Sequence, residues 1–200
     1  ADVLRRLDID PVARALAASP LHLPLLLFAH RRSGSIPPSR FAMFDEVVTG
    51  LVEWLEVGAL SLDHKRRALQ ALGVAAVPRG NAPLASAEVR RLVIDSLGDA
   101  LVPSADVDKL LTVFVACSLL VEDPPGHFAF HHLAMAEHLA AALWLETQVP
   151  GDSVAARLVD HEWHGTLRFY ADGGGAAAVV DMALLLAGAE PLALAATCAE

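Results

Sequence analysis

Apolar side chains recur at intervals of three and four residues through most of the chain, a spacing that places them on one face of an α-helix. The longest example runs from about Pro38 to Leu60, and its acidic residues fall largely on the other faces. Its regularly spaced apolar side chains are Phe41, Phe44, Val48, Leu51 and Leu55. The same pattern predicts further helices at about residues 11–18, 20–32, 61–77, 85–97, 105–118 and 132–148.

Side chains that favour the start of a helix precede several of these segments, because their oxygen atoms can accept hydrogen bonds from the first unpaired amides. Asp10 stands directly before Pro11, a residue that is common at the first helical position. The other expected caps are Ser61 or Asp63, Ser86 and Ser104.

In the middle of the chain the helical spacing gives way to two short segments of strand character. Leu119–Asp123 and His127–His131 are the predicted strands, and Pro124–Gly126 between them predicts a tight turn. Three helices precede this ribbon, and the helix predicted from His132 to about Gln148 follows it directly. These parts in this order are typical of a winged helix.

We therefore predict a mostly α protein with three parts. Residues 1–60 form a helical domain, residues 61–148 a winged-helix domain with a two-stranded wing, and residues 149–200 a set of short helices. The last part is interpreted as the start of an α-helical repeat region. Gly173–Gly175 is expected to act as a linker between two of its helices.

Hydrophobic residues make up 54% of the chain, which raises the question of a membrane span. The best apolar runs, Leu23–Ala29 and Val113–Val121, are far shorter than the roughly 20 residues that a spanning helix needs. The net charge of −9 disfavours binding to nucleic acid. Cys117 and Cys198 show no metal-binding or disulfide spacing, so we expect a cytoplasmic protein.

Two motifs of enzymatic sites are absent from the sequence. There is no G-x-x-x-x-G-K-[ST] loop, which holds the phosphates of ATP in many ATPases, and no G-x-S-x-G elbow of the serine hydrolases. We therefore expect no enzymatic activity from this chain alone and assign no catalytic residues.

Two groups of histidines have to be weighed as metal ligands. His131 and His138 are seven residues apart, which on a helix is about two turns or roughly 10 Å, too far to share one metal ion. His161 and His164 are suitably spaced but have no third ligand nearby. We predict no metal site and interpret these histidines as surface or interface residues.

His132 admits two interpretations. It stands where the second predicted strand meets the following helix, and the first amides of a helix are unpaired and positively polarised. A histidine at this point can donate a hydrogen bond to a phosphate oxygen that arrives from a neighbouring domain. The alternative is a histidine that caps the helix or packs locally.

Two stretches of the chain resemble the segments that follow the ATPase core in NACHT-type STAND signalling proteins. Ser19–Trp54 contains a Pro, a Leu-rich helix, a Gly-Ser-Ile-Pro turn and an Arg-x-x-x-Phe helix start. Phe128–Ala141 resembles the family's aromatic-x-aromatic-x-His motif with a Glu five residues later. The order and separation of the two stretches also suit the family. The matching residues are Pro20, Leu25–Leu27, Gly34–Pro37, Arg40, Phe44, Phe128, Phe130, His132, Glu137 and Ala140–Ala141.

The resemblance implies a regulatory role. In this family the winged helix folds over ADP in the resting state, and exchange of ADP for ATP permits oligomerisation. By resemblance, Pro20 packs on the adenine and His132 contacts the β-phosphate. ADP or ATP with Mg²⁺ is then the cofactor of a parent protein, and the expected partners are a preceding ATPase core, further copies on activation and a trigger ligand that the sequence does not specify.

Two other functions stand as alternatives. A stand-alone helical protein–protein adaptor would bind a partner without any dependence on nucleotide. A winged-helix DNA-binding regulator would read bases with the segment Ser104–Ser118. That segment carries two Asp residues and a single basic residue, Lys109, where a reading helix needs several donors.

Overall fold

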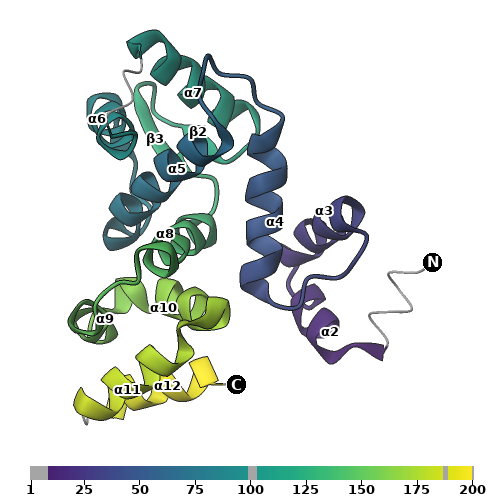
Figure 1. Ribbon diagram of the computed structural model, residues 1–200, viewed down its shortest axis with the longest axis vertical. Helices are drawn as coiled ribbons and strands as arrows, with labels where there is room; N and C mark the ends of the chain where they lie inside the picture. Colours follow the sequence, from purple (N-terminus) through teal and green to yellow (C-terminus); the bar gives the residue numbers. More distant parts are fainter. Residues whose placement is uncertain (1–8, 99–102, 187–188, 200) are drawn as a thin grey trace. The chain divides into compact units, whose positions relative to one another are not determined.

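The computed structural model describes residues 9–98, 103–186 and 189–199. The described chain is mostly helical (Figure 1), which confirms the predicted mostly α class, and it contains a small three-stranded antiparallel sheet. It divides into two compact units, the first ending at Trp54 and the second beginning at Leu55. Each unit has its own buried core.

The first unit is built from the helices α2 (Pro11–Ala17), α3 (His22–Ser33) and α4 (Arg40–Glu53). Asp10 caps α2 as predicted, because its carboxylate accepts hydrogen bonds from the amides of Val12 and Ala13 at 2.9 and 3.2 Å. Ser39 caps α4 by accepting from the Ala42 amide at 3.1 Å. The fully buried side chains of this unit include Ala13, Leu26, Ala29, Met43, Phe44 and Val52.

The helix predicted from Pro38 to Leu60 is shorter in the structure, because α4 ends before the unit boundary. The following residues are held by contacts within the second unit. The backbone carbonyl of Leu55 accepts a hydrogen bond from Nζ of the buried Lys65. Gly58 adopts a φ of +50°, a left-handed conformation that favours glycine and that a continuous helix does not contain. These contacts override the helical spacing of the sequence.

The second unit begins with the parts of a winged helix. In chain order these are α5 (Leu62–Ala76), η1 (Val77–Arg79), β1 (Leu84–Ala85), α6 (Ser86–Ser96), α7 (Ser104–Ala116), β2 (Leu120–Glu122), β3 (His127–Phe130) and α8 (Leu133–Thr147). Of the two predicted caps of α5, Ser61 is the one used: its hydroxyl and the His64 ring each accept from the other residue's amide at 3.2 Å. The core of this part includes Leu69, Leu72, Leu110, Phe114, Leu119 and Leu139.

The sheet of the winged helix has three strands: the two predicted strands of the wing, β2 and β3, and a third strand, β1, that the sequence pattern does not predict. β3 lies in the centre with β1 on one side and β2 on the other, and both pairings are antiparallel. Leu84 of β1 pairs with Phe128, and Leu120 of β2 pairs with Phe130. β1 is only two residues long, so its sequence carries no alternation that would predict it.

Asn81 extends this pairing beyond the end of β1. Its φ of 66° is a left-handed conformation that Asn adopts more readily than most residues. Its side-chain Nδ2 donates to the Phe130 carbonyl at 2.8 Å, and its Oδ1 accepts from the Phe130 amide at 3.0 Å. One side chain thus takes the place of a strand partner at the end of β3.

Asn81→Ala is expected to lower the free energy of unfolding by about 2–3 kcal/mol. The loss combines two hydrogen bonds of about 1 kcal/mol each with about 1 kcal/mol for placing Ala in the left-handed region. Asn81→Gly keeps the backbone conformation and should cost less, since it removes mainly the hydrogen bonds. Urea unfolding of both variants separates the two causes, and a smaller loss in Asn81→Ala than in Asn81→Gly would contradict this account.

The remaining helices of the second unit follow α8. They are α9 (Gly151–Leu158), η2 (His161–Trp163), α10 (His164–Tyr170), η3 (Ala171–Gly175), α11 (Ala176–Leu186) and α12 (Ala189–Ala199). α10 packs on α8 (Figure 1), and nearby the rings of Trp144 and Trp163 stack with their centroids 5.1 Å apart. The predicted linker Gly173–Gly175 is a helical turn in which Gly174 leaves helical geometry with a φ of 119°.

Among the described residues, one helical run is long and apolar enough to cross a membrane, namely His161–Leu186 with a mean hydropathy of 1.3. Gly174 bends this run, and its first half packs on α8. Core helices of soluble proteins meet the same criteria of length and composition, so the run does not assign the protein to a membrane.

Candidate functional site

Pro20 lies in the first unit, in the turn between α2 and α3. The turn is closed by the Ser19 carbonyl, which accepts hydrogen bonds from the amides of His22 at 3.0 Å and Leu23 at 3.1 Å. Pro20 itself is exposed, so one side of its ring is available to a flat partner such as an aromatic base.

The neighbourhood of Pro20 contains an imidazole that burial keeps neutral. The His22 ring meets Phe44 edge-on with centroids 5.8 Å apart, and the Arg40 guanidinium lies 5.7 Å from the same Phe44 ring. Burial, and then the positive charge of Arg40, lower the pKa of His22 below its usual value. His22 therefore contributes an aromatic edge rather than a charge at neutral pH.

His132 lies in the second unit at the start of α8. It directly follows β3 with an extended backbone, φ −138° and ψ 135°, and it is the residue that caps α8. Its side chain is exposed and makes no hydrogen bond to the first amides of the helix. The ring contacts only its neighbour His131 edge-on among the aromatic contacts found in the described chain, with centroids 4.8 Å apart.

This geometry bears on the two interpretations of His132. The His132 side chain does not cap α8, because it makes no hydrogen bond to the first amides of the helix. The imidazole and the unpaired amides at the helix start therefore both remain open to an incoming anion. Pro20 belongs to the first unit and His132 to the second.

The clustered histidines are interpreted above as surface or interface residues, and His138 is not on the surface. This residue is fully buried, and its ring meets Phe169 of α10 edge-on with centroids 5.5 Å apart. The carboxylate of Glu137 occupies the space over Gly165, where any side chain would collide with it. Both residues lie on faces of α8 that pack against α10, a contact that helical spacing alone does not reveal.

The other candidate ligands are dispersed. Among the residues that the structure describes, no group of three His, Cys, Asp or Glu side chains is arranged to hold a metal ion. The rings of His161 and His164 lie 5.0 Å apart, and Nε2 of His164 is 3.2 Å from the Leu158 carbonyl. His164 therefore links the start of α10 to the end of α9.

The face of the winged helix that would meet DNA offers few donors. Asp108 of α7 is tied to Arg90 of α6 by an ion pair of 2.8 Å. The turn between β2 and β3 is flanked by Glu122 and Asp123 and contains no Lys or Arg. The exposed residues of α7 are Ser104, Ala105, Lys109, Thr112 and Ala116. Phosphate contacts normally come from several basic side chains, and this face presents one.

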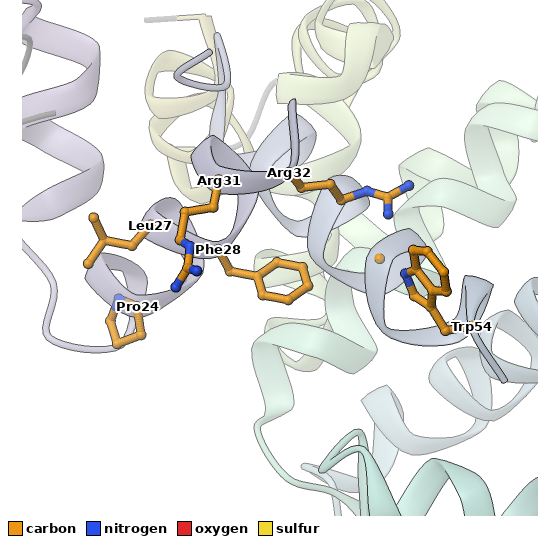
Figure 2. Close-up of a pocket in the computed structure, with 7 residues that line it drawn as sticks. Pro24, Leu27, Phe28, Arg31, Arg32 and Trp54 are labelled. Carbon is orange, nitrogen blue, oxygen red and sulfur yellow. The ribbon is translucent and has the colours of Figure 1, made fainter. Parts of the chain in front are cut away.

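One surface groove of the first unit was not predicted from the sequence. A groove of about 770 Å³ runs between α3 and the end of α4 (Figure 2), and the side chain of Trp54, which lines it, is 81% exposed. Its lining residues are Pro24, Leu27, Phe28, Arg31, Arg32, Gly50 and Trp54. A signal was present in the sequence, since a Gly inside an otherwise regular helical pattern often marks close packing.

The fold and these residues define a mostly helical protein with a winged-helix arrangement at the start of its second unit. No protein-family model, curated protein or solved structure matches the chain.

Proposed function

We propose that this chain is the regulatory, autoinhibitory part of a NACHT-type STAND ATPase, which closes over ADP in the resting state and opens to permit oligomerisation. The observation that carries the proposal is the exposed, uncapped imidazole of His132 at the start of α8, directly after the central wing strand. This is the position at which the resemblance expects a phosphate contact. The exposed Pro20 supports the proposal from the first unit.

The chemistry of each residue, taken within its own unit, suits one part of a nucleotide. His132 and the first amides of α8 supply hydrogen-bond donors and positive polarisation for a phosphate. Pro20 supplies a flat apolar surface for a base. ADP bound to a preceding ATPase core would, when present, be a ligand that favours the closed state. A ligand that binds one state more tightly than the other shifts the population toward it.

We also propose a cytoplasmic location. Both cysteines are free thiols, and burial raises the pKa of Cys117 and of Cys198. Such thiols are largely protonated and unreactive at neutral pH, which suits a reducing compartment.

In a protein that also contains the ATPase core, His132→Ala is expected to speed the release of ADP by about tenfold or more. The expectation follows from the loss of one charge-assisted hydrogen bond, worth about 1.5–3 kcal/mol. Release of a fluorescent ADP analogue measures it, and the variant should also oligomerise more readily without a trigger. His127→Ala is the matched control, because His127 is an exposed histidine of the same wing.

Two results would contradict the proposal. One is ADP release that is the same in His132→Ala as in the unaltered protein. The other is a coding sequence in which no ATP-binding loop precedes the segment described here, which would remove the source of the nucleotide.

A second candidate, the helical adaptor, is favoured by exposed leucines at the end of α11. Leu184, Leu185 and Leu186 are 61%, 75% and 41% exposed. Adjacent exposed leucines are typical of a surface that binds another protein. An adaptor would retain its partner equally with ADP, with ATP and without nucleotide, whereas a regulatory segment would not.

A further inference from the structure

The floor of the groove in the first unit is formed at Gly50, where α4 carries no side chain. A Cβ atom at Gly50 would lie 2.7 Å from Cε1 of Phe28 and 3.0 Å from Cδ of Arg32. Because Gly50 has no side chain, the Phe28 ring and the Arg32 stem lie close against the backbone of α4. Figure 2 shows the Phe28 ring directed toward Trp54 across this floor.

The walls of the groove are apolar and open to solvent. Leu27 and Phe28 are 40% and 37% exposed, and Trp54 is 81% exposed. The other two tryptophans of the chain, Trp144 and Trp163, are 7% and 3% exposed. Exposed aromatic side chains that gather around a groove are typical anchors of protein–protein contacts.

The two arginines of the groove differ in their pairing. Arg32 is neutralised by carboxylates of α4, with Nη1 2.6 Å from Glu53 and Nε 3.2 Å from Glu46. Hydrogen bonding to Glu53 raises the pKa of Arg32 above its usual value. Arg31 has no ion-pair partner among the described residues, and in Figure 2 its guanidinium lies on the far side of Phe28 from Trp54. The groove therefore combines an apolar centre with one available positive charge at its side.

The shape of the groove suits a short stretch of polypeptide. Its lining spans Pro24 to Arg32 of α3, which at 1.5 Å per residue is about 12 Å. That length corresponds to about two helical turns, or about four residues of extended chain. An anionic membrane or a nucleic acid fits less well, because phosphate contacts normally come from several available basic side chains, whereas of the two arginines that line the groove Arg32 is paired with Glu46 and Glu53.

We propose that this groove binds a short acidic peptide segment of a partner protein. An apolar or aromatic side chain of the peptide inserts between Phe28 and Trp54, and a carboxylate of the peptide pairs with Arg31. This interaction lies within the first unit and does not depend on the nucleotide function proposed above.

The test uses three fluorescein-labelled 12-residue peptides with the whole chain. All three carry the same Leu and Phe residues, spaced three and four apart. Their remaining positions are Asp and Glu in the first, Lys and Arg in the second, and Ser and Gln in the third. Fluorescence anisotropy is expected to show the acidic peptide binding at least about tenfold more tightly than the basic peptide. Trp54 emission should shift on binding, because Trp54 is the tryptophan exposed to the peptide.

Three variants locate the interaction. Trp54→Ala should abolish peptide binding without unfolding the protein, because the side chain is largely exposed. Arg31→Glu should reverse the preference from the acidic peptide to the basic one. Lys109→Glu is the control, since it makes the same change of net charge on an exposed residue of the second unit and should leave binding unchanged.

Each of the other outcomes overturns the proposal. Equal binding of all three peptides would mean that Arg31 selects nothing, and absence of binding would mean that the groove takes no such peptide. Equal losses in Lys109→Glu and Arg31→Glu would mean that net charge, not the groove, attracts the peptide. A shift of Trp54 emission with protein concentration alone, lost in Trp54→Ala, would identify a second copy of the chain as the occupant.

Discussion

Replacing Trp163 by alanine is expected to lower the free energy of unfolding by about 3–5 kcal/mol, the usual cost of removing a buried large aromatic side chain. Trp163 is 3% exposed, and its ring stacks on Trp144 at an interplanar angle of 19°. The Arg157 guanidinium lies 4.6 Å from the centroid of the Trp163 ring. One side chain thus joins α8, α9 and η2, and its removal leaves a cavity where they meet.

The same substitution elsewhere in the chain provides the control. Trp54→Ala removes an identical number of atoms from a side chain that is 81% exposed, so the expected change is within about 0.5 kcal/mol. Urea unfolding followed by circular dichroism measures both variants. A loss in Trp163→Ala no larger than the loss in Trp54→Ala would contradict the proposed role of the tryptophan stack.

Gly73→Leu is expected to lower the free energy of unfolding by about 3 kcal/mol or more, because it forces a side chain into a close helix crossing. A Cβ atom at Gly73 of α5 would lie 2.8 Å from the backbone carbonyl oxygen of Ala136 in α8. It would also lie 3.1 Å from Cβ of Leu139. Backbone atoms of a packed helix cannot move aside as a flexible side chain can, so α5 and α8 must separate.

Gly73→Ala should fall between the wild type and Gly73→Leu. The collision with α8 costs about 1–3 kcal/mol, and the higher helix propensity of Ala offsets about 1 kcal/mol of it. Gly165→Ala is the comparison, because there the atoms nearest to the new Cβ belong to the side-chain carboxylate of Glu137 rather than to a helix backbone. Thermal unfolding ranks the three variants. A Gly73→Leu protein as stable as the wild type would show that the two helices do not pack as described.

Features that depend on neighbouring residues could be predicted from the sequence. Asp10 and Ser61 were expected to start helices, and both accept hydrogen bonds from amides two or three residues further on. β2 and β3 were expected around a Pro-Pro-Gly turn and are present. The place of His132 between β3 and α8 follows in the same way, since it depends only on adjacent elements.

Features that depend on distant residues could not be predicted from the sequence. β1 exists because Leu84 and Ala85 find β3 about 40 residues later in the chain. His138 is buried because α10 returns to cover α8. The groove around Trp54 depends on Gly50 of one helix admitting Phe28 of another. In each case the sequence pattern is local, whereas the cause is a tertiary contact.

The helix α8 belongs to two cores at once. At Ala136 and Leu139 it packs against α5 of the winged helix, and at His138 and Trp144 it packs against the helices that follow. A straight helix of 15 residues is about 22 Å long and resists bending, so it acts as a rigid rod. A force applied at its N-terminal cap, His132, must therefore displace the winged helix and the C-terminal helices together. A ligand or domain that binds at this end of α8 can therefore move the whole second unit.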